Sequence, residues 1–198
     1  MSSFRNILTF GDSLTRGYHC GGRKYSPYSE ALQTMLNNEH RGCRIYNAGK
    51  NGETSQEMTS RLPFELRKNK FEVAIILGGT NDIAHFTAID IFSNIKRMHE
   101  IALENVNHSL AVSIPCSCNE ETKSAGLRKT KQDVNNMLKE YASGNERIQF
   151  VDLFNDLHVK NFKGMEYDIW DDQIHLTSAG YNRMAEMIWP KLVAVLDG

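Results

Sequence analysis

The 198-residue sequence lacks any apolar run long enough to cross a membrane. Its first apolar run, Ile7 to Phe10, is too short for the hydrophobic region of a secretion signal. Lys and Arg together number 23 against 24 Asp and Glu, and no dense basic stripe interrupts this balance. We therefore expect a cytoplasmic protein that binds neither nucleic acid nor an anionic membrane surface.

The sequence also has few cysteines, and their spacing does not match a zinc site. The four are Cys20, Cys43, Cys116 and Cys118. The closely spaced pair has no second pair to complete a metal-binding set, so free thiols in a reducing compartment are the simpler interpretation. Two nucleotide-binding patterns, Gly-x-x-x-x-Gly-Lys-Ser/Thr and Gly-x-Gly-x-x-Gly after the first strand, are missing, which disfavours nucleotide-binding classes.

Short apolar segments alternate with longer amphipathic segments along the chain. The short segments are rich in Val, Ile and Phe, as buried parallel strands are, and cover 6–10, 44–47, 73–77, 110–114 and 148–153. The longer segments predict helices over 26–36, 54–68, 87–103, 126–142 and 177–196, several with an N-cap signal such as Ser26, Thr54 or Thr177. This alternation predicts one α/β domain over 1–198, a three-layer α/β/α sandwich with a five-stranded, mostly parallel sheet.

Residues that carry chemistry follow the predicted strands. Ser13 comes just after the first strand, Asn81 follows the third, and Asp172 and His175 precede the last helix. Ligands of such sheets bind beyond the carboxyl ends of the strands, so we expect these side chains to meet. A serine hydroxyl attacks well only when an imidazole takes its proton, and a nearby carboxylate can orient that ring. An asparagine amide is a suitable neutral donor to a developing oxyanion.

This order of motifs resembles the GDSL-type, or SGNH, hydrolase family of esterases, lipases and thioesterases. The resemblance extends over nearly the whole chain, from Gly11-Asp12-Ser13-Leu14 to Asp172-Gln173-Ile174-His175. It implies the flavodoxin-like fold of that family. It also implies that Ser13 is the nucleophile, that His175 is the base, and that Asp172 orients the histidine.

The same resemblance implies an oxyanion hole. Its donors would be the backbone N–H groups of Ser13 and Gly52 and the side chain of Asn81, with Gly49 as an alternative to Gly52. The implied reaction is hydrolysis of a small carboxylic ester through an acyl-enzyme intermediate. We expect short acyl or acetyl groups, because 198 residues leave little material for a large lid over the site. An acyl thioester or a lysophospholipid is the alternative substrate. We expect no cofactor, no metal and no stable membrane insertion.

Several competing interpretations start from the same residues. A second Asp-x-x-His motif, Asp82 to His85, offers another acid and base to Ser13. Asp171, together with Asp172 and His175, would also suit a divalent metal ion. A non-catalytic flavodoxin-like binding protein is the alternative from a different class, because fold does not fix function. The Gly-x-Ser-x-Gly elbow of other serine esterases is absent, since position 15 is threonine.

Two long segments, 115–124 and 155–171, are expected to shape the substrate pocket. The second contains three aromatic residues, which we expect either to form an apolar wall for the acyl or alcohol group or to pack in the local core: Phe162, Tyr167 and Trp170.

Overall fold

The computed structural model describes residues 4–116, 125–157 and 169–198, and a five-stranded sheet lies at its centre. In spatial order the strands are β4 (Cys43–Gly49), β1 (Arg5–Gly11), β5 (Val73–Leu77), β6 (His108–Val112) and β7 (Ile148–Val151). All four pairings are parallel, so the sheet predicted to be mostly parallel has only parallel neighbours in the described parts of the chain.

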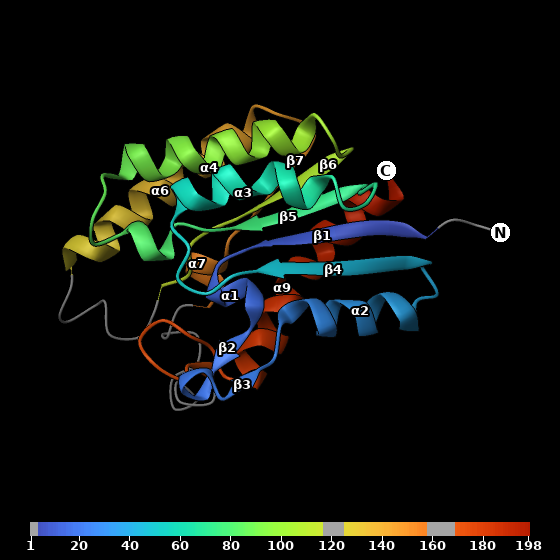
Figure 1. Ribbon diagram of the computed structural model, residues 1–198, viewed down its shortest axis with the longest axis horizontal. Coiled ribbons are helices and arrows are strands. Elements are labelled where there is room, and N and C mark those ends of the chain that lie inside the picture. The colour runs from blue at the N-terminus through green and yellow to red at the C-terminus, as the bar shows by residue number, and fades with distance from the viewer. Residues whose placement is uncertain (1–3, 117–124, 158–168) are drawn as a thin grey trace.

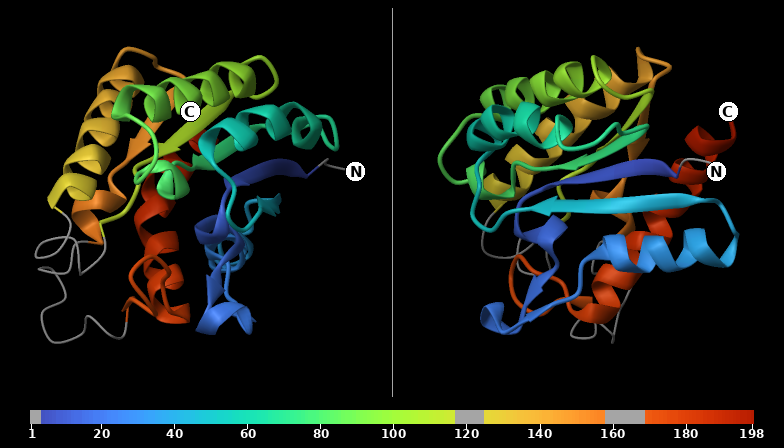
Figure 2. Two further views of the ribbon diagram at one scale, coloured as in Figure 1. Left: turned by 60° about the vertical axis from the view of Figure 1, so that its left-hand side comes forward. Right: turned by 45° about the vertical axis from the view of Figure 1, so that its right-hand side comes forward.

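Helices cover both faces of this sheet and confirm the three-layer architecture (Figures 1 and 2). One face carries α3 (Ser55–Leu66), α4 (Ala88–Leu103) and α6 (Ala125–Ser143), and the other carries α2 (Tyr28–Asn38) and α9 (Ser178–Asp197). The shorter elements are α1 (Ser13–Arg16), α7 (Leu153–Asp156), the hairpin β2 (Tyr18–His19) and β3 (Lys24–Tyr25), and two 3₁₀ turns, η1 (Cys20–Gly22) and η2 (Thr80–Asp82).

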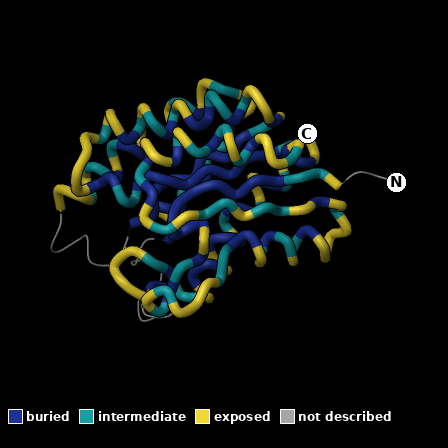
Figure 3. The backbone as a smooth tube through the Cα atoms, viewed as in Figure 1, coloured by how far each residue is buried: buried dark blue, intermediate teal, exposed yellow. Residues whose placement is uncertain are grey.

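The sheet separates two apolar cores. Ile75 of β5 joins the core shared with α2 and α9, whereas its neighbour Ile76 joins the core shared with α3, α4 and α6. Both side chains are almost fully buried, which is why the parallel strands are continuous apolar runs in the sequence. Figure 3 shows these buried strands between helices whose outer sides are exposed.

The helix starts follow their capping signals with one exception. The side chains of Thr54 and Thr177 accept backbone N–H groups in the first turns of α3 and α9, as predicted. The prediction that Ser26 caps the helix after it is wrong, because Pro27 occupies the N-cap of α2 and makes no side-chain bond. The Ser26 hydroxyl instead lies 3.0 Å from His19 Nε2, a partner that the β2–β3 hairpin brings close.

The carboxyl ends of β1, β4 and β5 lie together beside α1, while the two ends of the chain lie at the opposite edge of the sheet (Figure 1). The residues singled out in the sequence follow these strand ends, so this edge is where the site is built. No helix in the described parts of the chain is long and apolar enough to cross a membrane.

Candidate active site

Ser13 is presented by a sharp turn at the end of β1. A side chain on Gly11 would place a Cβ 2.1 Å from Thr15 Oγ1, so only glycine fits there. Asp12 caps the short helix α1 by accepting the Leu14 N–H at 2.9 Å. Ser13 therefore begins a helix at the edge of the sheet, where only 6% of the residue is exposed.

The structure brings Ser13, His175 and Asp172 into one hydrogen-bonded chain. Ser13 Oγ lies 3.0 Å from His175 Nε2, and His175 Nδ1 lies 2.8 Å from Asp172 Oδ2. Asp172 Oδ1 accepts the N–H groups of Ile174 and His175, each at 2.7 Å. Partial burial acts to raise the pKa of Asp172, but these bonds outweigh it and hold the pKa below its usual value. The ionised carboxylate thus fixes the orientation of the imidazole.

The two glycines considered for the oxyanion role differ in their hydrogen bonding. The Gly49 N–H donates to Asn47 Oδ1 at 2.9 Å and is occupied. Within the described residues the Gly52 N–H has no acceptor, and its φ of 76° lies in the left-handed region that favours glycine. Asn81 Nδ2 donates to the Glu53 carbonyl at 2.9 Å, which leaves the second amide hydrogen for a ligand.

Asp82 and His85 do not form a second acid–base pair. The buried Asp82 carboxylate accepts the N–H of Ser55 at 2.9 Å and its hydroxyl at 2.6 Å. His85 is exposed after η2. Asp82 therefore holds the start of α3 against the turn that carries Asn81, and the alternative triad is not assembled.

The metal set considered from the sequence is not assembled either, because Asp172 and His175 bind each other while Asp171 turns away. Asp171 Oδ2 instead accepts the Cys20 N–H at 2.7 Å. His19, Cys20 and Asp171 place one potential ligand atom each within 4.8 Å of one another. Because His19 Nδ1 lies 3.3 Å from Cys20 Sγ, hydrogen bonds within the chain account for this cluster.

The expected aromatic wall is only partly within the described structure. Trp170 is 4% exposed and packs in the core on the α2 and α9 face, so it belongs to the local core and not to a wall. Phe162, Tyr167 and Cys118 lie outside the described residues. Tyr18 is an aromatic neighbour that the sequence did not reveal, with its ring centre 4.4 Å from that of His175.

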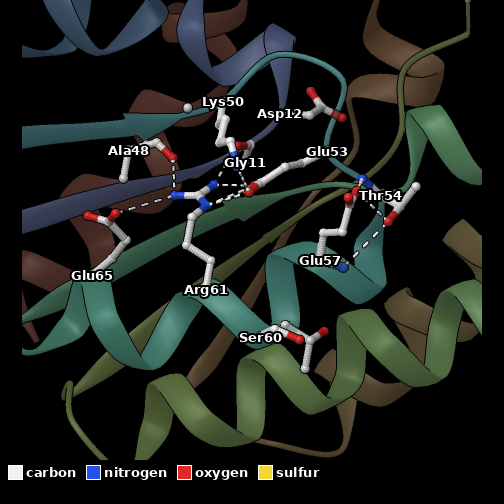
Figure 4. Close-up of polar contacts among 12 residues, drawn as sticks. Gly11, Asp12, Ala48, Lys50, Glu53, Thr54, Glu57, Ser60, Arg61 and Glu65 are labelled. Atoms are coloured by element: carbon white, nitrogen blue, oxygen red, sulfur yellow. Dashed lines mark hydrogen bonds and ion pairs between the residues drawn. The ribbon is translucent and has the colours of Figure 1, made fainter.

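An ion pair between the buried Glu53 and the half-buried Arg61 was not predicted from the sequence (Figure 4). Arg61, in the middle of α3, reaches back to the carboxylate of Glu53. A glutamate in a loop and an arginine eight residues later give no recognisable signal, because exposed helix faces contain the same residues.

The sequence and the fold of the chain are similar to those of known proteins. Residues 9–183 match the GDSL-like Lipase/Acylhydrolase family. A lipolytic protein of the G-D-S-L family from Veillonella parvula DSM 2008 has a similar structure, with a TM-score of 0.78 and 20% identity over 96% of this chain and 98% of that one. A carbohydrate acetylesterase family member from Sinorhizobium meliloti gives a TM-score of 0.75 and 18% identity over 98% of this chain and all of that one.

Among curated proteins, the uncharacterized lipoprotein YqeF of Bacillus subtilis (strain 168) is 30% identical over 84 residues. That match covers 42% of this chain and only 35% of the relative. The solved structures, at their low identities, establish the fold, whereas the family match covers most of the sequence. The chain therefore belongs to the GDSL-like lipase/acylhydrolase family of serine ester hydrolases.

Proposed function

We propose that a single domain over residues 1–198 hydrolyses small carboxylic esters, with Ser13 as nucleophile, His175 as base and Asp172 as the acid that orients it. The observation that carries this proposal is the chain of contacts at 3.0 Å and 2.8 Å from hydroxyl to imidazole to carboxylate. These are the parts that acyl transfer to serine requires, in the order in which it uses them. Family membership supports the same activity.

In the proposed reaction, Ser13 Oγ attacks the ester carbonyl while His175 Nε2 takes its proton. The N–H groups of Ser13 and Gly52 and the Asn81 amide stabilise the oxyanion. The protonated His175 then gives its proton to the leaving alcohol, and the acyl group stays on Ser13. A water molecule, deprotonated by His175, attacks this acyl-enzyme. The bond to Ser13 Oγ then breaks, His175 returns the proton to Oγ, and the acid is released.

The proposed substrates carry short acyl or acetyl groups. The small exposure of Ser13 and the Tyr18 ring beside His175 both favour a narrow approach to the nucleophile. Two of the structurally similar proteins are a carbohydrate acetylesterase family member and a family 3 carbohydrate esterase from Clostridium thermocellum, which agrees with acetyl esters. We place this activity in the cytoplasm, where free thiols such as Cys20 and Cys43 persist.

A chain-length series tests the proposal. p-Nitrophenyl esters from acetate to palmitate, acetylated sugars and acyl-CoA are compared, with Ser13→Ala as the control. We expect the highest kcat/KM on the shortest esters and loss of that rate in the control. A preference for palmitate or acyl-CoA would replace the short-chain assignment. No turnover of any substrate by the folded protein would favour the non-catalytic binding protein.

A further inference from the structure

The turn between β4 and α3 has to hold Gly52 in place, yet Gly52 itself makes few contacts. Apart from its two neighbours in the chain, no described residue has a heavy atom within 4 Å of the position that a Cβ on Gly52 would occupy. The next residue, Glu53, is only 4% exposed, which is unusual for a carboxylate in a loop. A buried carboxylate needs a partner, and that partner shows what fixes the turn.

The Glu53 carboxylate has two cationic partners (Figure 4). Lys50, whose side chain is exposed, lies 3.1 Å from Glu53 Oε1, whereas Arg61 is the more buried partner and also contacts the backbone. Arg61 Nε lies 2.8 Å from both oxygens of Glu53. The other two nitrogens donate to the carbonyls of Ala48 at 3.1 Å and Gly11 at 3.3 Å, while the guanidinium lies 4.3 Å from the centre of the Phe10 ring. The planar guanidinium group of Arg61 therefore joins the carboxyl ends of β1 and β4 to the turn between β4 and α3.

Glu53 extends this connection to the proposed oxyanion donors. It follows Gly52 directly, and its carbonyl accepts the hydrogen bond from Asn81 Nδ2 at 2.9 Å. Gly11, whose carbonyl accepts a hydrogen bond from Arg61, lies two residues before Ser13. The three proposed donors are thus linked through the contacts of Glu53 and Arg61.

We propose that Glu53 and Arg61 are positioning residues that hold the oxyanion hole in its working geometry. The inference rests on the proposed function, since it assigns a role within that same site. Donors to an oxyanion act because they are already placed before the reaction, and a shift of about 1 Å is enough to cost about 10²-fold in rate. The pair acts on kcat through Gly52 and Asn81 without touching the reacting atoms.

A role limited to the stability of α3 does not require this pair. The start of α3 is already held by the Thr54 capping box and by the bonds from Ser55 to Asp82. Its inner face is held by Met58 and Leu62, which are fully buried. Buried ion pairs are also often no more stabilising than apolar residues of the same size. The Glu53–Arg61 pair is therefore needed mainly to fix the turn between β4 and α3.

The test compares Arg61→Lys and Glu53→Gln with a matched control, Arg147→Lys. Arg147 also donates to several backbone carbonyls, among them those of Leu103 and Asn107, but it does so at the opposite edge of the sheet. We expect both test variants to lower kcat on a p-nitrophenyl ester about 10- to 100-fold, with KM within about threefold of wild type. The control should lose thermal stability and keep its kcat.

An unchanged kcat in folded test variants, with only the melting temperature lowered as in the control, would overturn the inference. Should Arg61→Lys fail to fold, Glu53→Gln carries the same prediction, because it keeps the size and the acceptor oxygen of the side chain. Ser13→Ala in the same assay distinguishes failure of the proposed hydrolase function from failure of the positioning role of Glu53 and Arg61. If that variant kept the wild-type rate, the proposed function would fail and the inference with it. A dead Ser13→Ala beside fully active test variants would remove the inference alone.

Discussion

At the edge of the sheet, individual hydrogen bonds determine which residues are available for chemistry. Asn47 Oδ1 accepts the Gly49 N–H, which is why Gly52 is the proposed glycine donor. Ser55 donates to the Asp82 carboxylate, whereas two backbone N–H groups orient Asp172, whose other oxygen contacts the His175 ring. Gly52 is therefore proposed as a donor because no described residue accepts its N–H group, and Asp172 is proposed as the orienting acid because its carboxylate contacts the His175 ring.

Removal of the imidazole tests which histidine serves Ser13. We expect His175→Ala to lower kcat about 10⁴- to 10⁶-fold, as loss of a triad member does, and addition of Ser13→Ala to lower it little further. The control is His85→Ala, which removes an exposed ring and should stay within about twofold of wild type, measured on the same ester. Inactivity of His85→Ala together with activity of His175→Ala would contradict the proposed triad.

Asn81→Ala separates catalysis from loop structure. It removes one proposed oxyanion donor, so kcat should fall about 10²- to 10³-fold, or about 3–4 kcal/mol. It also removes the bond to the Glu53 carbonyl, and a modest fall in melting temperature is expected. Both quantities are measured on one preparation. A lowered melting temperature with unchanged kcat would show that Asn81 only holds the turn.

Asp12 gives the protein a pH-dependent stability. Burial, with smaller contributions from Asp82 and Glu53, raises the pKa of Asp12 from 3.8 to about 7. Between these values the folded state keeps a proton that the unfolded state has lost, so the free energy of unfolding should fall as pH rises and level off above about 7.

Asp12→Asn keeps the acceptor for the Leu14 N–H and removes the titration. The variant should be more stable than wild type at about pH 8, by on the order of 2–4 kcal/mol, and this gap should shrink toward about pH 5. Urea unfolding across this range measures it. Stability curves that run parallel for the two proteins would show that Asp12 does not titrate in this window.

At the scale of secondary structure, the long elements were predictable because each has its own signal. The central strand β5 is apolar on both faces, the other strands carry short apolar runs, and the helix starts at Thr54, Thr87 and Thr177 have polar caps. The hairpin of β2 and β3 and the short helix α1 were not predicted, since two to four residues show no periodicity. The Ser26 cap failed for the related reason that its partner comes from that hairpin.

The capping box of α3 offers a prediction at this scale. Thr54 accepts the Glu57 N–H, and the Glu57 carboxylate accepts the Thr54 N–H in return. Thr54→Ala should lower the free energy of unfolding by about 1 kcal/mol, whereas Thr54→Ser should keep most of it because a hydroxyl acceptor remains. Urea unfolding compares the two, and equal stability of both variants would contradict a capping role.

Across the whole molecule, the parallel sheet brings together residues that lie 162 positions apart in the chain, Ser13 and His175. The order of the motifs predicted this meeting, because parallel strands all end at one edge. The link between Glu53 and Arg61 was not predictable in the same way. It depends on the path of a turn and on a long side chain reaching backward along α3, which no local pattern specifies.

Covalent labelling is the most direct test of whether Ser13 is a nucleophile that His175 activates. The protein is incubated with a fluorophosphonate, and the modified peptide is identified by mass spectrometry beside the Ser13→Ala and His175→Ala variants. We expect one adduct on Ser13 in the wild type, none in Ser13→Ala and a greatly slowed reaction in His175→Ala, because the imidazole must take the hydroxyl proton. An adduct on another residue, or a folded wild-type protein that stays unlabelled, would contradict the role of Ser13 as nucleophile.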